Sequence, residues 1–177
     1  MGRYIFVLAF LFVNLFWGSS LLSAKDNRPN ILLILVDDMG YSDIAPFGGE
    51  IRTPTLDSLA KSGIRFTDFH TSVSCSPTRS MLLSGTDNHL AGLGNMSEVI
   101  APNQVGKPGY EGHLNDRVVS IAMLLRDAGY ATSMSGKWHL GEEVKDDPYH
   151  QGFEKAYTML QGGTSHFDDE SMMYANY

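Results

Sequence analysis

The stretch SCSPTRSMLLSG, residues 74–85, gives the clearest indication of how this chain folds. Pro77 fits the first turn of a helix and Gly85 fits the position just after its end, so the stretch predicts a short helix. Cys75 precedes the helix, and Arg79 follows it at i+4, which places both side chains on one helical face. Cys75 is the only cysteine of the chain. An unpaired cysteine in an exported protein indicates a reactive or modified side chain.

Strand and helix patterns alternate on both sides of this stretch. The apolar run over residues 30–36 predicts a strand buried on both faces. The expected elements are strands over 30–36, 64–70 and 131–135, and helices over 54–62 (with Thr53 as N-cap), 77–84 and 118–128. Such alternation predicts an α/β fold with a mainly parallel sheet. Residues 87–116 are rich in Gly, Asn and Pro and predict a long surface excursion over the site.

Asp37 and Asp38 follow the first expected strand directly. Open α/β sheets bind their ligands at the carboxyl ends of parallel strands. Two adjacent carboxylates repel, so a cation or a proton is needed to hold them together in a buried site. Their hard oxygens suit Ca²⁺ or Mg²⁺. The alternative is a pair of solvated aspartates in a turn.

Three further residues are candidates for contact with a substrate. Lys137 and His139 are separated by one residue, so in an extended segment both side chains point the same way. A cationic lysine and a histidine suit sites where negative charge develops. His166 lies in a glycine-rich loop and could line the cleft. The alternatives are a loop lysine and two histidines with structural roles.

The pattern Cys-x-Pro-x-Arg, followed by Gly85, resembles the signature of the type I sulfatases, and the chain is most similar in character to the bacterial arylsulfatases. The run GKWHLG, residues 136–141, resembles the second sulfatase signature. The resemblance implies an alkaline-phosphatase-like α/β fold, with helices flanking a mainly parallel sheet. It also implies sulfate ester hydrolysis, with either a small molecule or a glycan as the sulfate ester.

The resemblance assigns roles to the candidate residues. Cys75 would be converted to formylglycine by the formylglycine-generating enzyme, and Asp37, Asp38 and the modified Cys75 would bind Ca²⁺, with Mg²⁺ as the other possibility. Arg79 would hold the modified side chain, and Lys137 and His139 would contact the sulfate. A hydrated aldehyde carries two hydroxyls, one to attack sulfur and one to release sulfate, whereas a serine offers only one.

Other interpretations of the same residues remain open. Cys75 could be a buried small side chain or a thiolate nucleophile at a helix N-terminus. The protein could be a phosphonate or phosphate ester hydrolase of the same superfamily, or a truncated binding protein without catalytic activity. The family's later metal and sulfate ligands are absent, so we expect residues 25–177 to be the N-terminal part of a sulfatase catalytic domain, inactive alone.

The N-terminus and the net charge restrict location and partners. Residues 1–24 combine Arg3, an apolar run and small residues, which predicts a signal peptide and export to the periplasm or medium, or along the lysosomal route in a eukaryote. The net charge of -7 excludes general attraction to nucleic acid or anionic membranes. We therefore expect no nucleic-acid partner and no stable membrane association. Recognition of an anionic substrate must depend on local cations and a metal.

Overall fold

The computed structural model describes residues 27–163 and 173–176. The chain divides into two compact units, residues 1–36 and 37–177. Within the described part of the chain, no helix has the length and apolar character needed to cross a membrane. The expected signal peptide, residues 1–24, lies outside the described residues.

In the first unit, residues 27–36 form neither helix nor strand. The expected strand over 30–36 is therefore wrong for this structure, and its six apolar side chains from Ile31 to Val36 are 41–84% exposed instead of buried. A strand is defined by hydrogen bonds to a neighbouring strand, and an apolar run alone does not supply that partner. The apolar run over residues 30–36 suits a buried strand, but in this structure the segment is not assigned to a strand.

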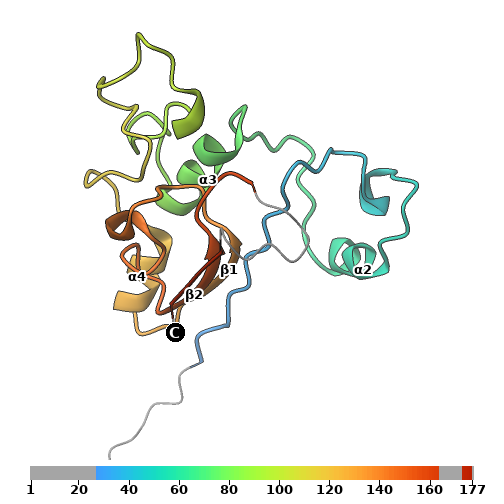
Figure 1. Cartoon of the computed structure of the whole chain (residues 1–177). Helices are drawn as coiled ribbons and strands as arrows, with labels where there is room; N and C mark the ends of the chain where they lie inside the picture. Colours follow the sequence, from blue (N-terminus) through green and yellow to red (C-terminus); the bar gives the residue numbers. More distant parts are fainter. Residues whose placement is uncertain (1–26, 164–172, 177) are drawn as a thin grey trace, which may run out of the picture. The chain divides into compact units, whose positions relative to one another are not determined.

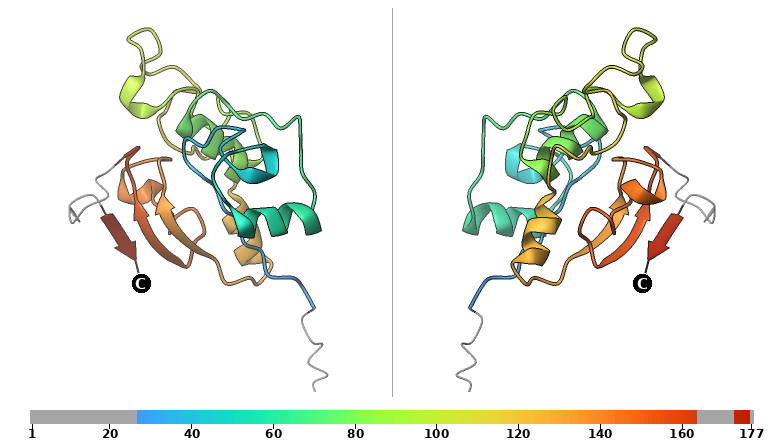
Figure 2. Two further views of the ribbon diagram at one scale, coloured as in Figure 1. Left: turned by 90° about the vertical axis from the view of Figure 1, so that its right-hand side faces the viewer. Right: turned by 90° about the vertical axis from the view of Figure 1, so that its left-hand side faces the viewer.

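The second unit combines short helices with one small sheet (Figure 1). Its helices are α2 (Pro54–Ser62), α3 (Cys75–Ser84) and α4 (Ile121–Asp127), and its 3₁₀ turns are Ala45–Phe47, Ser97–Val99 and Val144–Asp146. The strands β1 (Ser133–Lys137), β2 (Lys155–Met159) and β3 (Met173–Asn176) lie side by side in that order (Figure 2). β1 and β2 are parallel, whereas β3 is antiparallel to β2. The predicted α/β fold is confirmed for this part of the chain.

Helix positions follow the proline and glycine signals closely. The helix over 54–62 and the helix ending at Ser84 are confirmed, and the latter begins two residues early, at Cys75. The helix expected over 118–128 is shorter because Ser120 is its N-cap, with an Oγ that accepts from the Met123 N–H at 3.1 Å. The Thr53 hydroxyl does not cap its helix, since it accepts from the Ala45 N–H at 3.1 Å.

Strand positions follow the sequence less closely. The strand expected over 131–135 lies at 133–137. The strand expected over 64–70 is wrong, because these residues form only bends and irregular backbone, with Ile64 83% and Phe66 65% exposed. Alternating polarity marks a segment that could cover a core on one face, but none of the strands in the described part of the chain pairs with this one.

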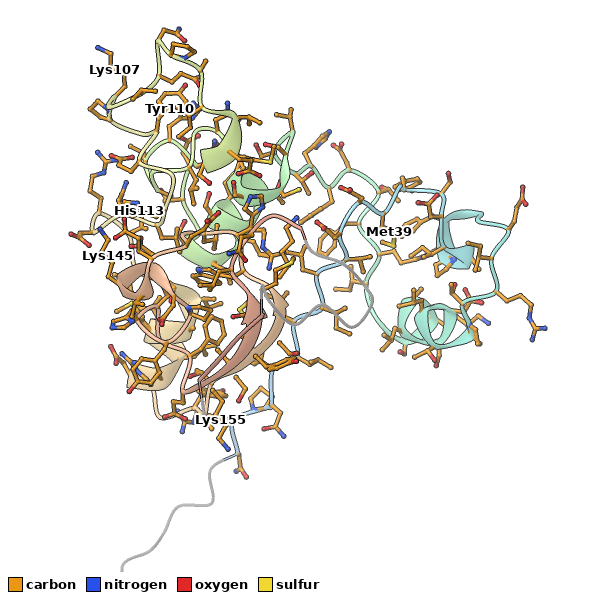
Figure 3. The ribbon with its side chains drawn as sticks, in the orientation of Figure 1. Met39, Lys107, Tyr110, His113, Lys145 and Lys155 are labelled. Carbon is orange, nitrogen blue, oxygen red and sulfur yellow. The ribbon has the colours of Figure 1, made fainter. Side chains whose placement is uncertain are left out.

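The core of the second unit surrounds Trp138 and Leu140, both fully buried. Leu83 of α3 packs into this cluster together with Ala91, Leu93 and Leu114. The last three belong to residues 87–116, so the expected surface excursion is only partly correct: its base supplies core residues. Figure 3 shows Lys107 and Tyr110 on its outer part, with His113 where the segment returns.

Arg79 connects α3 to the end of β1. Its side chain is largely buried, at 9% exposure. Nε donates to the Trp138 carbonyl at 2.7 Å, and Nη2 donates to the Lys137 carbonyl. The planar guanidinium presents several donors in a fixed arrangement, so one side chain can hold two consecutive carbonyls. Arg79 therefore fixes the distance between the start of α3 and the end of β1.

We expect Arg79→Lys to lower the free energy of unfolding by about 1–3 kcal/mol, because a lysine cannot reproduce both bonds and leaves a buried carbonyl without its donor. The matched control is Arg65→Lys. Arg65 also donates to a main-chain carbonyl, that of Pro46 at 2.7 Å, but it is exposed. Its replacement should change stability by less than about 0.5 kcal/mol. Denaturant unfolding measures both, and equal effects would contradict the anchoring role of Arg79.

Candidate active site

Cys75 is the first residue of α3, and several contacts fix that end of the helix. The Ser74 carbonyl accepts from the Thr78 N–H at 3.1 Å, and the Thr78 hydroxyl donates to the Ser72 carbonyl at 3.1 Å. Pro77 is fully buried in the first turn. Cys75 itself is half-buried and forms no disulfide. Its side chain is therefore accessible and stands on a fixed backbone.

Asp37 and Asp38 meet Cys75, as expected from the sequence. One ligand atom from each of the three residues lies within 4.8 Å of the other two. Both aspartates are exposed, so the expectation of a buried carboxylate pair is not met in this structure. Asp38 has a φ of 53°, a region that aspartate enters more readily than most residues. The cluster can offer a cation two hard carboxylate oxygens and the side chain at position 75.

Lys137, the last residue of β1, reaches the same cluster. Its Nζ lies 3.1 Å from Oδ2 of Asp37 and 3.4 Å from Oδ1, and its side chain is 10% exposed. The Lys137 ammonium therefore lies beside the carboxylate of Asp37. The main-chain carbonyl of Lys137 accepts a hydrogen bond from Arg79, which fixes the backbone of Lys137.

Arg79 contributes a second positive charge nearby. Burial lowers the pKa of its guanidinium, while the negative charges of Asp37 and Cys75 act in the opposite direction. The hydrogen bonds of Arg79 nevertheless go to main-chain carbonyls. The structure therefore gives Arg79 an anchoring role and an electrostatic one. Direct contact with a modified Cys75 stays a prediction.

His139 contacts a different carboxylate from Lys137. The expected extended backbone is wrong at this residue, because His139 has a φ of 58°, in the left-handed region. Its ring is 4% exposed, and Nε2 lies 3.0 Å from Oε1 of Glu98. Among the described residues, Asp38 and His139 are the non-glycine positions with positive φ. Unusual backbone at a site is a reason to propose function there.

Glu98 is a site residue that the sequence did not reveal. It lies 41 residues before His139 and belongs to the Gly- and Asn-rich segment. Burial raises the pKa of its carboxyl, but main-chain hydrogen bonding and the contact with His139 outweigh it, so the pKa is lowered overall. A single acid in an irregular segment carries no sequence signal for such a long-range contact. His166, the other candidate, lies outside the described residues.

A cavity of about 520 Å³ adjoins Glu98. Its lining includes His113 and the carboxylates Glu98, Glu111, Glu142, Glu143 and Asp146. His113, labelled in Figure 3, lies 4.0 Å from Asp146 through Nδ1. Burial raises the pKa of Asp146, opposed by His113.

Known proteins with similar sequences are sulfatases. The chain is 55% identical over 147 residues to an uncharacterized sulfatase of Schizosaccharomyces pombe, covering 81% of this chain and 26% of that protein. It is 49% identical over 147 residues to an arylsulfatase of Klebsiella aerogenes, covering 83% of this chain and 31% of that protein. The chain therefore spans about a quarter to a third of the length of these relatives.

Solved structures show the same fold. The crystal structure of Ps i-CgsB matches with a TM-score of 0.67 and 33% identity, over 79% of this chain and 30% of that chain. The crystal structure of Ps i-CgsB in complex with k-i-k-neocarrahexaose matches with a TM-score of 0.62 and 31% identity, over 74% of this chain and 28% of that chain. This part of the chain thus has the alkaline-phosphatase-like fold of the sulfatases. A family model described as Sulfatase matches residues 29–176, and the chain belongs to the sulfatase family.

Proposed function

We propose that the protein containing this chain hydrolyses sulfate esters through a formylglycine made from Cys75, with the help of a divalent metal. The observation that carries the proposal is the convergence of Asp37, Asp38 and Cys75 within 4.8 Å, with the Lys137 ammonium 3.1 Å from Asp37. Carboxylates for a metal, a cysteine that can be modified, and a cation for an anionic substrate are the components that this chemistry requires.

The residues at the cluster fit a hard divalent cation. Asp37 and Asp38 would hold it through carboxylate oxygens. An oxygen from a hydrated formylglycine would suit Ca²⁺ or Mg²⁺ better than a thiol does, because both ions prefer oxygen ligands. We propose Ca²⁺, with Mg²⁺ as the alternative. Three ligands are fewer than the roughly six to eight that Ca²⁺ takes, so the others come from outside this cluster. When bound, the metal would acidify a hydroxyl of the modified residue.

The protein's own residues would orient and neutralise the sulfate. Lys137 is held at the end of β1 with little freedom, because its carbonyl accepts from Arg79 and its ammonium pairs with Asp37. A fixed cation needs no reorganisation when charge develops at a sulfate oxygen. Arg79 adds a second positive charge behind the cluster.

A sulfated glycan is the substrate class we propose, in a protein that is exported to the periplasm or medium. The support is the fold likeness to Ps i-CgsB, whose structure includes a complex with k-i-k-neocarrahexaose. The cluster is open, with Asp37 and Asp38 both exposed, so a bulky alcohol portion would not need to enter a closed pocket. Small aryl sulfates serve as probes of the same chemistry.

The first prediction concerns Cys75. In a host that has the formylglycine-generating enzyme, the protein from the complete gene should show a peptide about 18 mass units lighter at this residue, since CHO replaces CH₂SH. Mass spectrometry of the tryptic peptide measures the change. Modified protein should hydrolyse 4-nitrophenyl sulfate, whereas Cys75→Ala should not.

Three outcomes would contradict this proposal. The first is active protein that carries only unmodified cysteine. The second is faster turnover of 4-nitrophenyl phosphate than of the sulfate, which would favour a phosphate ester hydrolase with the same modified residue. Complete inactivity of modified protein towards all sulfate esters would favour a binding protein.

The second prediction concerns the metal ligands. Asp37→Asn and Asp38→Asn should each abolish tight Ca²⁺ binding, because each removes a charged oxygen ligand and leaves too few at the cluster. Titration calorimetry on the protein from the complete gene measures the affinity. Asp68→Asn is the matched control, because Asp68 is also an exposed aspartate and lies 3.5 Å from His70, outside the cluster. Unchanged Ca²⁺ affinity in Asp38→Asn would refute the assignment.

The third prediction concerns Lys137. We expect Lys137→Ala to lower kcat/KM by about 10²–10³-fold, the usual effect of losing one preorganised charge or donor. Lys145→Ala is the matched control, since Lys145 also pairs with a carboxylate, that of Glu143 at 3.1 Å, but on an exposed surface. Lys145→Ala should leave kcat/KM unchanged. A Lys137→Ala enzyme that loses stability but keeps full turnover would indicate a structural role only.

A further inference from the structure

The ring of His139 is enclosed on its Nε2 side by two residues from distant segments. Nε2 lies 3.0 Å from Oε1 and 3.2 Å from Oε2 of Glu98. Gly162 lies against the same pair. A Cβ added to Gly162 would come within 2.7 Å of Cε1 and 2.8 Å of Nε2 of His139, and within 2.9 Å of Oε1 of Glu98. Only a residue without a side chain leaves this contact undisturbed.

The other ring nitrogen of His139 is free. Nδ1 is buried and has no hydrogen-bond partner among the described residues. The main-chain N–H of His139 donates to the Leu160 carbonyl at 3.0 Å, which fixes the backbone from which the ring projects. One nitrogen is therefore fully engaged, and the other is left without a protein partner.

The carboxylate decides which nitrogen carries the proton. An ionised Glu98 only accepts hydrogen bonds, so Nε2 must donate. The opposite tautomer would direct the Nε2 lone pair at two carboxylate oxygens and would leave a buried Nδ1–H without an acceptor, which is costly. The partner of one imidazole nitrogen sets the state of the other. Nδ1 is consequently the nitrogen that is left unprotonated in the neutral ring.

We propose that Glu98 is a positioning residue, which holds the proton of His139 on Nε2 and presents Nδ1 as the working atom of this histidine. The inference rests on the proposed function in so far as His139 takes part in sulfate ester hydrolysis. Glu98 itself touches neither Cys75 nor the carboxylate pair, and it acts through the ring. Gly162 packs against the Glu98–His139 contact, and its lack of a side chain leaves that contact undisturbed.

The kinetic test uses the protein expressed from the complete gene. Glu98→Leu removes the acceptor and should lower kcat for 4-nitrophenyl sulfate by about 10–100-fold, by analogy with the carboxylates that orient metal-binding histidines. Glu98→Gln should lie between Glu98→Leu and wild type, because an amide oxygen can still accept from Nε2. In the His139→Ala background, Glu98→Leu should have no further effect. An equal loss in both backgrounds would overturn the proposal.

Glu111→Leu is the matched control. Glu111 comes from the same segment, lines the same cavity and pairs with Arg117 at 3.0 Å, but it does not contact His139. Its replacement changes the local charge by the same amount and should leave kcat unchanged. An equal loss in Glu111→Leu would show that cavity charge, and not the contact with His139, is responsible, and would overturn the proposal.

A spectroscopic test needs no activity. With ring-¹⁵N-labelled histidine, and the His139 signals assigned by their loss in His139→Gln, wild type should show a protonated Nε2 and an unprotonated Nδ1. Its Nε2–H should exchange slowly, and that signal should disappear in Glu98→Leu but persist in Glu111→Leu. A proton on Nδ1, or an Nε2–H signal unaffected by Glu98→Leu, would overturn the proposal. If wild type shows no sulfate ester hydrolysis, the proposed function fails while this test still decides the role of Glu98.

Discussion

The arrangement of the site depends on one buried side chain, Arg79. It joins α3, which carries Cys75, to the end of β1, which carries Lys137, although these segments are almost sixty residues apart. Burying a guanidinium is unfavourable unless hydrogen bonds and opposite charges compensate for lost hydration. Here two carbonyls accept hydrogen bonds from it, and electrostatic interaction with Asp37 and Cys75 favours its cationic form. The same residue thus sets the geometry and the electrostatic potential of the cluster.

The sequence predicted the helices well because their signals are local. Pro54 marks the start of α2, and Pro77 and Gly85 mark the first turn and the end of α3, whatever packs on these helices. The strands expected over 30–36 and 64–70 failed for the opposite reason. A strand needs a partner that the segment itself does not encode, and in this structure both segments leave large apolar side chains exposed.

The candidate site likewise combines residues that local motifs identify with contacts that depend on distant segments. Asp37, Asp38, Cys75 and Lys137 could be identified from short motifs, and the structure brings these four together. The orientation of His139 could not, because it depends on a φ of 58° and on Glu98, which lies 41 residues away. An i, i+2 argument holds only for extended backbone. His139 lies beyond the end of β1, and its side chain contacts Glu98 whereas that of Lys137 contacts Asp37.

Charge balance indicates why a metal and an anionic substrate should bind together at this cluster. Two carboxylates, Asp37 and Asp38, face two cations, Lys137 and Arg79, so without a metal the formal charges cancel. A net charge of -7 gives an anion no attraction from the rest of the chain. Adding a divalent cation makes the cluster positive by two formal charges. In the proposed function, metal binding therefore turns a neutral cluster into an anion site.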